Sequence, residues 1–123
     1  MENKKIRSFT DLIVWQKAHK LILDVYLITK KFPIEERFGL CDQLRRASVS
    51  ITSNIVEGFY RRTKNDKTHF YYLALSSLAE VRNQLLIAKD LYYITYEKFQ
   101  GLAMKCLEIK KILNGFISSS LSK

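Results

Sequence analysis

Apolar residues recur at alternating steps of three and four along most of the chain, a spacing that places them on one face of an α-helix. Four segments follow this pattern. They predict helices over residues 11–31, from Leu40 to Gly58–Tyr60, over 66–93, and from after Thr95 to about Ile117. Pro33 separates the first two, because the residue before a proline avoids the α-helical conformation. A short turn is expected at 34–37, and the tail 118–123 is expected to fray.

One apolar stripe on each segment defines the expected core. The stripes are Val14, Ala18, Leu21, Val25, Ile28 and Phe32; Leu40, Leu44, Ala47, Ile51 and Ile55; Phe70, Ala74, Ser77, Leu78, Val81, Leu85 and Ala88; and Phe99, Leu102, Cys106, Ile109, Leu113 and Phe116. Long helices joined by short loops pack as antiparallel neighbours. The sequence therefore predicts an all-α, up-and-down four-helix bundle, built as a single domain over residues 1–123 with a basic arm at 1–8.

Composition agrees with this fold and excludes several others. Gly (4) and Pro (1) are too scarce for the many turns of a β-sandwich or barrel. No segment reaches the apolar length of a membrane span, and no apolar stretch follows the charged N-terminus as in a secretory signal. We expect a cytoplasmic protein with no membrane partner. Cys41 and Cys106 could pair, but small buried thiols are the more common state in a reducing compartment.

Several helices carry more apolar surface than one core stripe requires. The residues off the main stripes that we assign to a subunit interface are Leu23, Leu27, Val49, Val56, Phe59, Tyr72, Leu75 and Leu86. Apolar residues clustered on several helices are typical of a buried interface between copies of a chain. The sequence therefore predicts a homo-oligomer. The alternative is a monomer whose central helices are more fully enclosed.

No catalytic motif accompanies the fold. The chain has no glycine-rich phosphate loop and no HExxH pair, and His19 and His69 fall on different predicted helices. Glu57 and Glu80 could act as a general acid–base pair, but such carboxylates are more often structural. We assign a structural polar role to Gln43, Asn54, Glu57 and Glu80. We expect no catalytic residue, no metal site and no cofactor.

Basic residues are the strongest functional signal. The formal net charge is +9, which attracts polyanions such as nucleic acid. Arg45 and Arg46 lie on the second predicted helix, and a denser group surrounds the loop after it: Arg61, Arg62, Lys64 and Lys67. Lys4, Lys5 and Arg7 make the N-terminal arm basic. Arginine forks match phosphate oxygens, and the nearby aromatic residues at 60 and 70–72 could stack on unpaired bases.

Several spaced motifs resemble a known bacterial family, the four-helix-bundle proteins encoded in intervening sequences of 23S ribosomal RNA genes. The motifs are Phe9-x-Asp11-Leu12-x-Val14-Trp15-Gln16-x-Ala18; Phe32-Pro33-x-x-Glu36; Gln43-Leu44-Arg45-Arg46-Ala47; Ser50-Ile51; Asn54-Ile55-x-Glu57-Gly58; Ser77-Leu78-x-Glu80; and Gln84-Leu85-x-Ile87-Ala88. The resemblance covers residues 9–117. Ser76 departs from the pattern, since relatives often have glycine there.

The resemblance implies a left-handed bundle that assembles as a ring-like homopentamer and has no established enzymatic activity. The family is also similar to the accessory variability determinant of diversity-generating retroelements, a basic pentamer that binds nucleic acid and a reverse transcriptase. Our main hypothesis is a non-enzymatic RNA- or DNA-binding oligomer without strong sequence specificity. Its phosphate contacts would come from Arg45, Arg46, Arg61, Arg62, Lys64 and Lys67. The alternative is a protein-interaction scaffold, for example for a reverse transcriptase or a ribosomal component.

Overall fold

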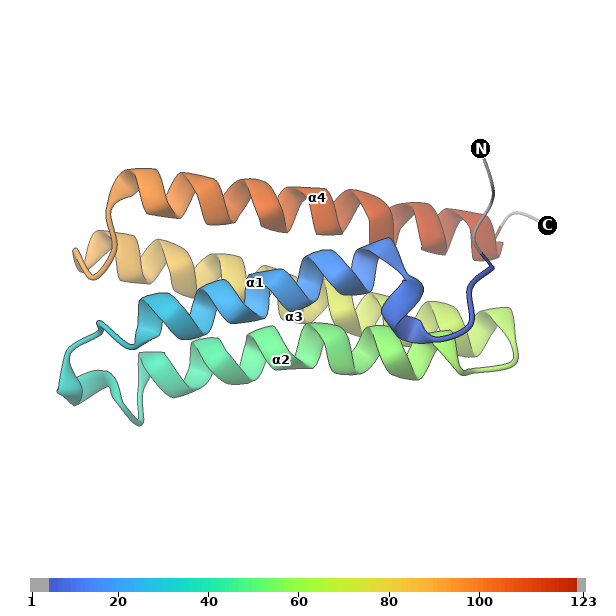
Figure 1. Cartoon of the computed structure of the whole chain (residues 1–123), viewed down its shortest axis with the longest axis horizontal. Helices are drawn as coiled ribbons and strands as arrows, with labels where there is room; N and C mark the ends of the chain where they lie inside the picture. Colours follow the sequence, from blue (N-terminus) through green and yellow to red (C-terminus); the bar gives the residue numbers. More distant parts are fainter. Residues whose placement is uncertain (1–4, 122–123) are drawn as a thin grey trace.

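The computed structural model describes residues 5–121, and their side chains to residue 119. Four α-helices and two short 3₁₀ turns form the described chain: η1 (Phe9–Asp11), α1 (Ile13–Thr29), η2 (Ile34–Glu36), α2 (Leu40–Phe59), α3 (Lys64–Asp90) and α4 (Tyr96–Leu121). The helices run alternately up and down, with the start of η1 and the end of α4 at the same end of the bundle (Figure 1). The predicted all-α four-helix bundle is confirmed.

The core lies along the bundle axis, where each helix contributes one apolar stripe. Helices α1 and α3 each pack against α2 and α4, and α2 and α3 make the most extensive contact. The predicted stripes of α1 and α2 are buried throughout. On α3 the prediction was wrong at one position: Tyr71 is buried and Phe70 is only half-buried. Phe99 and Phe116 of α4 pack at the margin of the core.

Five helix ends differ from the prediction: both ends of α1, both ends of α3 and the C-terminal end of α4. Ser8 caps η1 in a reciprocal pair with Asp11, and the extended backbone of Leu12 delays the start of α1 to Ile13. Helix α3 begins at Lys64, capped by Thr63, whose hydroxyl accepts from the backbone N–H of Asp66. Helix α4 continues to Leu121, beyond its predicted end near Ile117.

Helix α2 approaches α3 closely at its C-terminal end. Gly58 is buried, and a Cβ atom at this position would lie 2.5 Å from the ring of Tyr71. Nearer the middle of both helices, the hydroxyl oxygens of Ser50 and Ser77 are 2.8 Å apart. Small residues at both levels therefore permit the short separation between these two helices.

The partly buried carboxylate of Asp24 links α1 to α4. Asp24 accepts hydrogen bonds from Lys20 on its own helix and from Lys105 on α4. Burial acts to raise the pKa of Asp24, but the hydrogen bonds and charges of Lys105 and Lys20 outweigh it, so the pKa lies below its usual value. Asp24 is therefore ionised at neutral pH and holds both ammonium groups.

Helix α3 ends in a turn that requires a left-handed residue. Tyr92 has φ +64°, and the backbone N–H groups of Tyr92 and Tyr93 donate to the carbonyls of Lys89 and Ala88. This is the Schellman arrangement, in which glycine usually occupies the left-handed position. The turn directs the hydroxyl of Tyr93 to Glu36, whose other oxygen accepts from the N–H of Leu40 at the start of α2. Glu36 thus joins the turn after α3 to the beginning of α2.

We expect Tyr92→Gly to raise the free energy of unfolding by about 1 kcal/mol, because glycine adopts positive φ without the steric cost that a Cβ atom imposes. Tyr92 is 92% exposed, so its ring contributes little packing. Urea unfolding followed by circular dichroism measures the change. Tyr92→Ala, which removes the ring but keeps the strained backbone, is the control and should remain close to the unchanged protein. Equal stabilisation by both substitutions would refute the backbone explanation.

Candidate nucleic-acid interface

Aromatic contacts bring the N-terminal arm to the loop between α2 and α3. The ring of Phe9 lies 6.4 Å from that of Tyr60 and 5.3 Å from that of Trp15, centroid to centroid. Phe59 packs edge-on against Tyr60. Figure 1 shows η1 and the α2–α3 loop at the same end of the bundle. Two basic segments that are about 50 residues apart in the sequence therefore share one end of the molecule, which we call the basic end.

Four exposed cations of the basic end make no ion pair within the described part of the chain. Lys5 and Arg7 precede η1, and Arg62 and Lys64 lie in or beside the α2–α3 loop. None of these four has its side chain within 4.0 Å of a described carboxylate. Tyr60, 58% exposed, precedes the loop cations and contacts Phe9 of η1. Lys4 of the predicted arm lies outside the described residues.

Two other predicted cations of the loop are engaged by the protein itself. Arg61 donates to Glu57 over 2.6 Å, and its guanidinium lies 4.6 Å from the centre of the Phe70 ring. The ammonium of Lys67 donates to the carbonyls of Gly58 and Phe59 at the end of α2. A cation at this position satisfies carbonyls that have no partner within the helix and offsets the negative end of its dipole.

Arg45 and Arg46 lie elsewhere. They precede Arg61 by about four turns of α2, which separates them from the basic end by more than about 20 Å along the helix. Arg45 donates to the hydroxyl of Thr29 over 2.8 Å and lies over the ring of Tyr26, so it joins α2 to α1. Arg46 is exposed and pairs with Asp42 one turn earlier. The six predicted phosphate contacts therefore do not form one patch.

The residues assigned to structural polar roles have different environments. Asn54 donates to the backbone carbonyl of Ser50, over 2.9 Å, and to its hydroxyl. Glu57 is held by Arg61, whereas Gln43 and Glu80 are exposed. The sequence reasoning missed the side-chain oxygen of Gln84, which is buried with no described hydrogen-bond donor. The histidines lie against rings: His19 stacks on Trp15, and His69 meets Phe70 edge-on.

The apolar residues assigned to a subunit interface lie on two different parts of the surface. Those largely open to solvent are Leu23, Leu27, Val49, Tyr72 and Leu86, and those half-buried are Val56, Phe59 and Leu75. Leu23 and Leu27 belong to α1 and Val49 to α2, whereas Leu75 and Leu86 line a groove between α3 and α4. The structure therefore does not bring the assigned residues into one continuous face.

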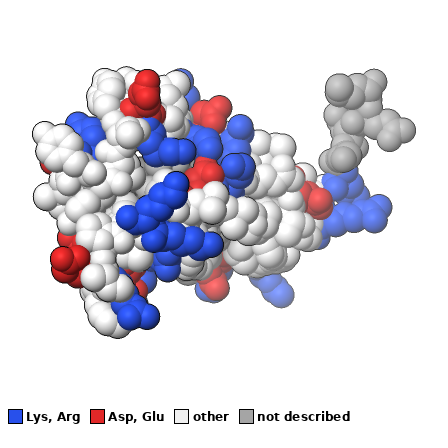
Figure 2. All heavy atoms as spheres, turned by 60° about the vertical axis from the view of Figure 1, so that its left-hand side comes forward, with Lys and Arg blue, Asp and Glu red and all other residues white. Residues whose placement is uncertain are grey.

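Charge and burial limit what other chemistry the described chain offers. Figure 2 shows basic side chains in groups on the face in view, with fewer acidic ones among them.

Cys41 and Cys106 are free, buried thiols, so they do not pair. Across the described residues, no group of three His, Cys, Asp or Glu side chains could hold a metal ion. No described helix is long and apolar enough to cross a membrane.

We expect Lys67→Met to lower the free energy of unfolding by about 1 kcal/mol, because the carbonyls at the end of α2 lose a charged donor while the aliphatic stem is kept. Thermal unfolding by circular dichroism measures the loss. Lys64→Met removes the same charge from an exposed side chain three residues away and is the control. A Lys64 effect as large as that of Lys67 would contradict a capping role.

Comparisons with known proteins relate this chain to a protein family and to a solved structure. A family model described as "23S rRNA-intervening sequence protein" matches residues 10–115. A crystal structure of a protein of unknown function from the S23 ribosomal protein family of Bacteroides thetaiotaomicron superposes with a TM-score of 0.79. The two chains are 24% identical, and the match covers 85% of this chain and 98% of the other. No curated protein matches this chain. Since the family model covers most of the sequence, the chain belongs to the 23S rRNA-intervening sequence protein family.

Proposed function

We propose that this chain is a non-enzymatic homo-oligomer that binds RNA or DNA through the basic end, without strong sequence specificity. The observation that carries the proposal is the contact between Phe9 and Tyr60, which brings the basic N-terminal arm to the basic α2–α3 loop. Separately, either segment offers only a few charges. Together they present Lys5, Arg7, Arg62 and Lys64 to solvent at one end of the bundle.

The chemistry of these groups supports binding to the phosphate backbone rather than to particular bases. Exposed lysine and arginine side chains contact phosphate oxygens, and such contacts carry no sequence information. The exposed ring of Tyr60 offers a stacking surface for an unpaired base, which favours single-stranded segments. Because binding of this kind releases counterions, its affinity should fall steeply as salt is added.

Self-association would multiply this attraction. The proposed self-interface uses the outer surface of α1 and α2, where Leu23 is 48% exposed, Leu27 60% and Val49 40%. A ring-like assembly, with five subunits as the resemblance implies, would repeat the basic end around one axis. Several weak sites on one particle then engage one polyanion with an effective affinity far above that of a single site.

We expect Arg62→Glu with Lys64→Glu to weaken binding of a single-stranded RNA by about tenfold or more at low salt, since two phosphate contacts become repulsive. Neither side chain pairs with a described carboxylate, and a carboxylate at the first position of α3 suits the positive end of its dipole, so folding should be retained. Fluorescence anisotropy across a salt series measures the affinity.

Lys30→Glu with Lys31→Glu makes the same change in net charge at the opposite end of α1 and is the matched control. It should weaken binding less than the Arg62–Lys64 pair does. If both pairs reduce the affinity equally, attraction depends on net charge alone and the basic end has no special role. An affinity that does not change between low and physiological salt would exclude the phosphate mechanism.

We expect Leu23→Glu with Val49→Glu to shift the assembly towards monomers, because two carboxylates would be buried without partners at the proposed interface. Light scattering coupled to size-exclusion chromatography measures the mass. Ile34→Glu with Leu91→Glu, which alters two exposed apolar residues outside that surface, is the control and should leave the mass unchanged. A monomeric unsubstituted chain at high concentration would refute self-association.

A further inference from the structure

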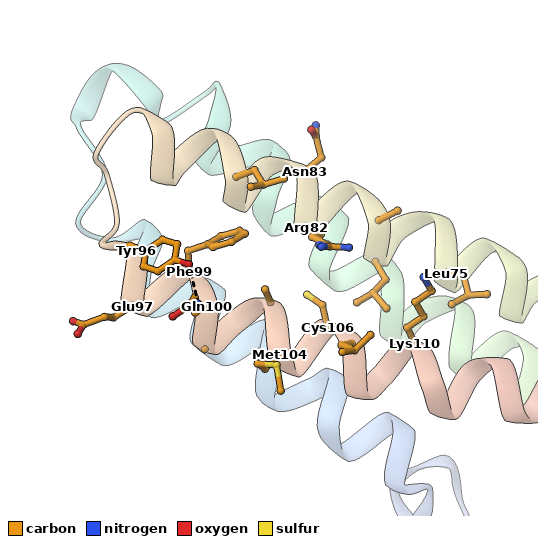
Figure 3. A pocket seen from close by; sticks show the side chains of 16 residues that line it. Leu75, Arg82, Asn83, Tyr96, Glu97, Phe99, Gln100, Met104, Cys106 and Lys110 are labelled. Carbon is orange, nitrogen blue, oxygen red and sulfur yellow. Dashed lines mark hydrogen bonds between the residues drawn. The ribbon is translucent and has the colours of Figure 1, made fainter.

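A large groove runs between α3 and α4, away from the basic end. Its volume is about 980 Å³. Figure 3 shows side chains from both helices lining it from Leu75 on α3 to Tyr96 near the start of α4. Most of its surface is apolar, contributed by Leu75, Leu78, Ala79, Leu86, Phe99 and Leu107. The groove is open to solvent rather than enclosed, so it suits an extended occupant better than a small buried ligand.

The spacing of the lining residues fits a helix as the occupant. On α3, Leu75, Ala79, Arg82 and Leu86 follow steps of four, three and four. On α4, Gln100, Ala103, Leu107 and Lys110 follow steps of three, four and three, so this side of the groove is apolar only in its middle. Each helix thus has a second set of residues at helical spacing, which we call a seam. Two such seams, about 16 Å long, form the surface against which a further helix packs.

Small residues permit a close approach at the middle of the groove. Ala79 on α3 and Ala103 on α4 both belong to its lining. Cys106 lies at the floor, where burial raises the pKa of its thiol to about 11 against the opposing effect of Arg82, so the floor carries no charge at neutral pH. An apolar side chain of an incoming helix would therefore meet an uncharged surface.

The charges of the groove define the chemistry of the occupant. Arg82 from α3 and Lys110 from α4 both project into the space between the helices (Figure 3). Neither forms an ion pair with a described carboxylate. A helix that covered these two cations without offering carboxylates would leave buried charges unpaired, which is strongly unfavourable. Glu97, the one carboxylate of the lining, lies near the other end of the groove.

The charge of the chain makes a second copy a poor occupant. Four of its carboxylates already pair with cations of the same chain: Asp24 with Lys20 and Lys105, Asp42 with Arg46, Glu57 with Arg61, and Glu108 with Lys17. Glu80 and Glu97 form no ion pair with a described cation, but a copy that offered them would also bring a formal net charge of +9 to a groove that already holds two cations. Charge complementarity therefore favours a different, acidic protein as the source of the carboxylates.

We propose that the α3–α4 groove binds an acidic amphipathic helix of a partner protein, with its apolar stripe along the groove and its carboxylates at Arg82 and Lys110. This recognition is of the helix-in-groove kind, in which apolar anchors recur at three- and four-residue steps. It uses a surface separate from the basic end, so the two proposals stand or fall independently.

The test uses the full-length chain and a labelled synthetic peptide of about 18 residues, helical, with leucine at three- and four-residue steps and glutamate on both flanks. Fluorescence anisotropy should show binding in the micromolar range, on the order of 10 µM or tighter. A second peptide with lysine in place of every glutamate should bind at least about tenfold more weakly.

Arg82→Glu with Lys110→Glu should reverse this preference, so that the lysine peptide binds more tightly than the glutamate peptide. Lys30→Glu with Lys31→Glu makes the same change in net charge outside the groove and should leave the preference as it was. Ala79→Gln, which blocks the close approach but keeps every charge, should reduce binding of the glutamate peptide by about tenfold.

Three results would overturn the proposal. The first is no binding of either peptide by a folded chain. The second is a preference that survives the Arg82–Lys110 reversal, which would place the peptide elsewhere on a generally basic surface. The third is loss of the oligomer in the Ala79→Gln variant, which would show that a second copy of the chain occupies the groove. RNA binding through the basic end would be unaffected by the first two results.

Discussion

Burial of one apolar stripe from each helix fixes how all four helices are rotated about their axes. Val14, Leu44, Val81 and Ile109 all have essentially no exposed surface, and each belongs to a stripe that faces the same core. A helix turned away from this orientation would expose such residues, at a cost of about 2 kcal/mol for each large apolar side chain. The positions of the cations and of the residues that line the α3–α4 groove therefore follow from the core.

The same constraint decides which polar groups are used inside the chain. Helix α2 lies against α1 on one side, so Arg45 reaches Thr29 and the ring of Tyr26. It lies against α3 on the other side, so Ser50 meets Ser77 and the ammonium of Lys67 returns to the end of α2. Each of these contacts converts a cation or hydroxyl that could face a ligand into a link between helices. The exposed cations of the basic end form no such ionic link with the described residues.

Two surfaces remain that the fold itself does not use. The basic end combines exposed cations with an exposed aromatic ring, a combination suited to phosphate and base. The α3–α4 groove combines a partly apolar lining with two cations, which suits a helix that carries carboxylates. Their separation along the bundle would let one particle hold a nucleic acid and a protein together, so the two modes of binding are compatible rather than competing.

The sequence by itself determined the helices and most of the core, because three- and four-residue periodicity is a local property that survives without knowledge of neighbours. It erred where two adjacent aromatic residues competed for one inward position: Tyr71 is buried and Phe70 is not, since Gly58 leaves space for the Tyr71 ring. The sequence pattern also placed the end of α3 three residues too late. A glycine would have indicated the left-handed turn, but the residue with positive φ is Tyr92.

Only the tertiary structure decided which basic residues face solvent and which serve the fold. Arg61 and Arg62 are adjacent and chemically identical, yet one is held by Glu57 and Phe70 and the other is free of described carboxylates. The contact of Phe9 with Tyr60, which unites the two basic segments, joins residues about 50 positions apart. Such contacts depend on the relative placement of helices, and that placement is set by the packing of the whole core rather than by any local run of residues.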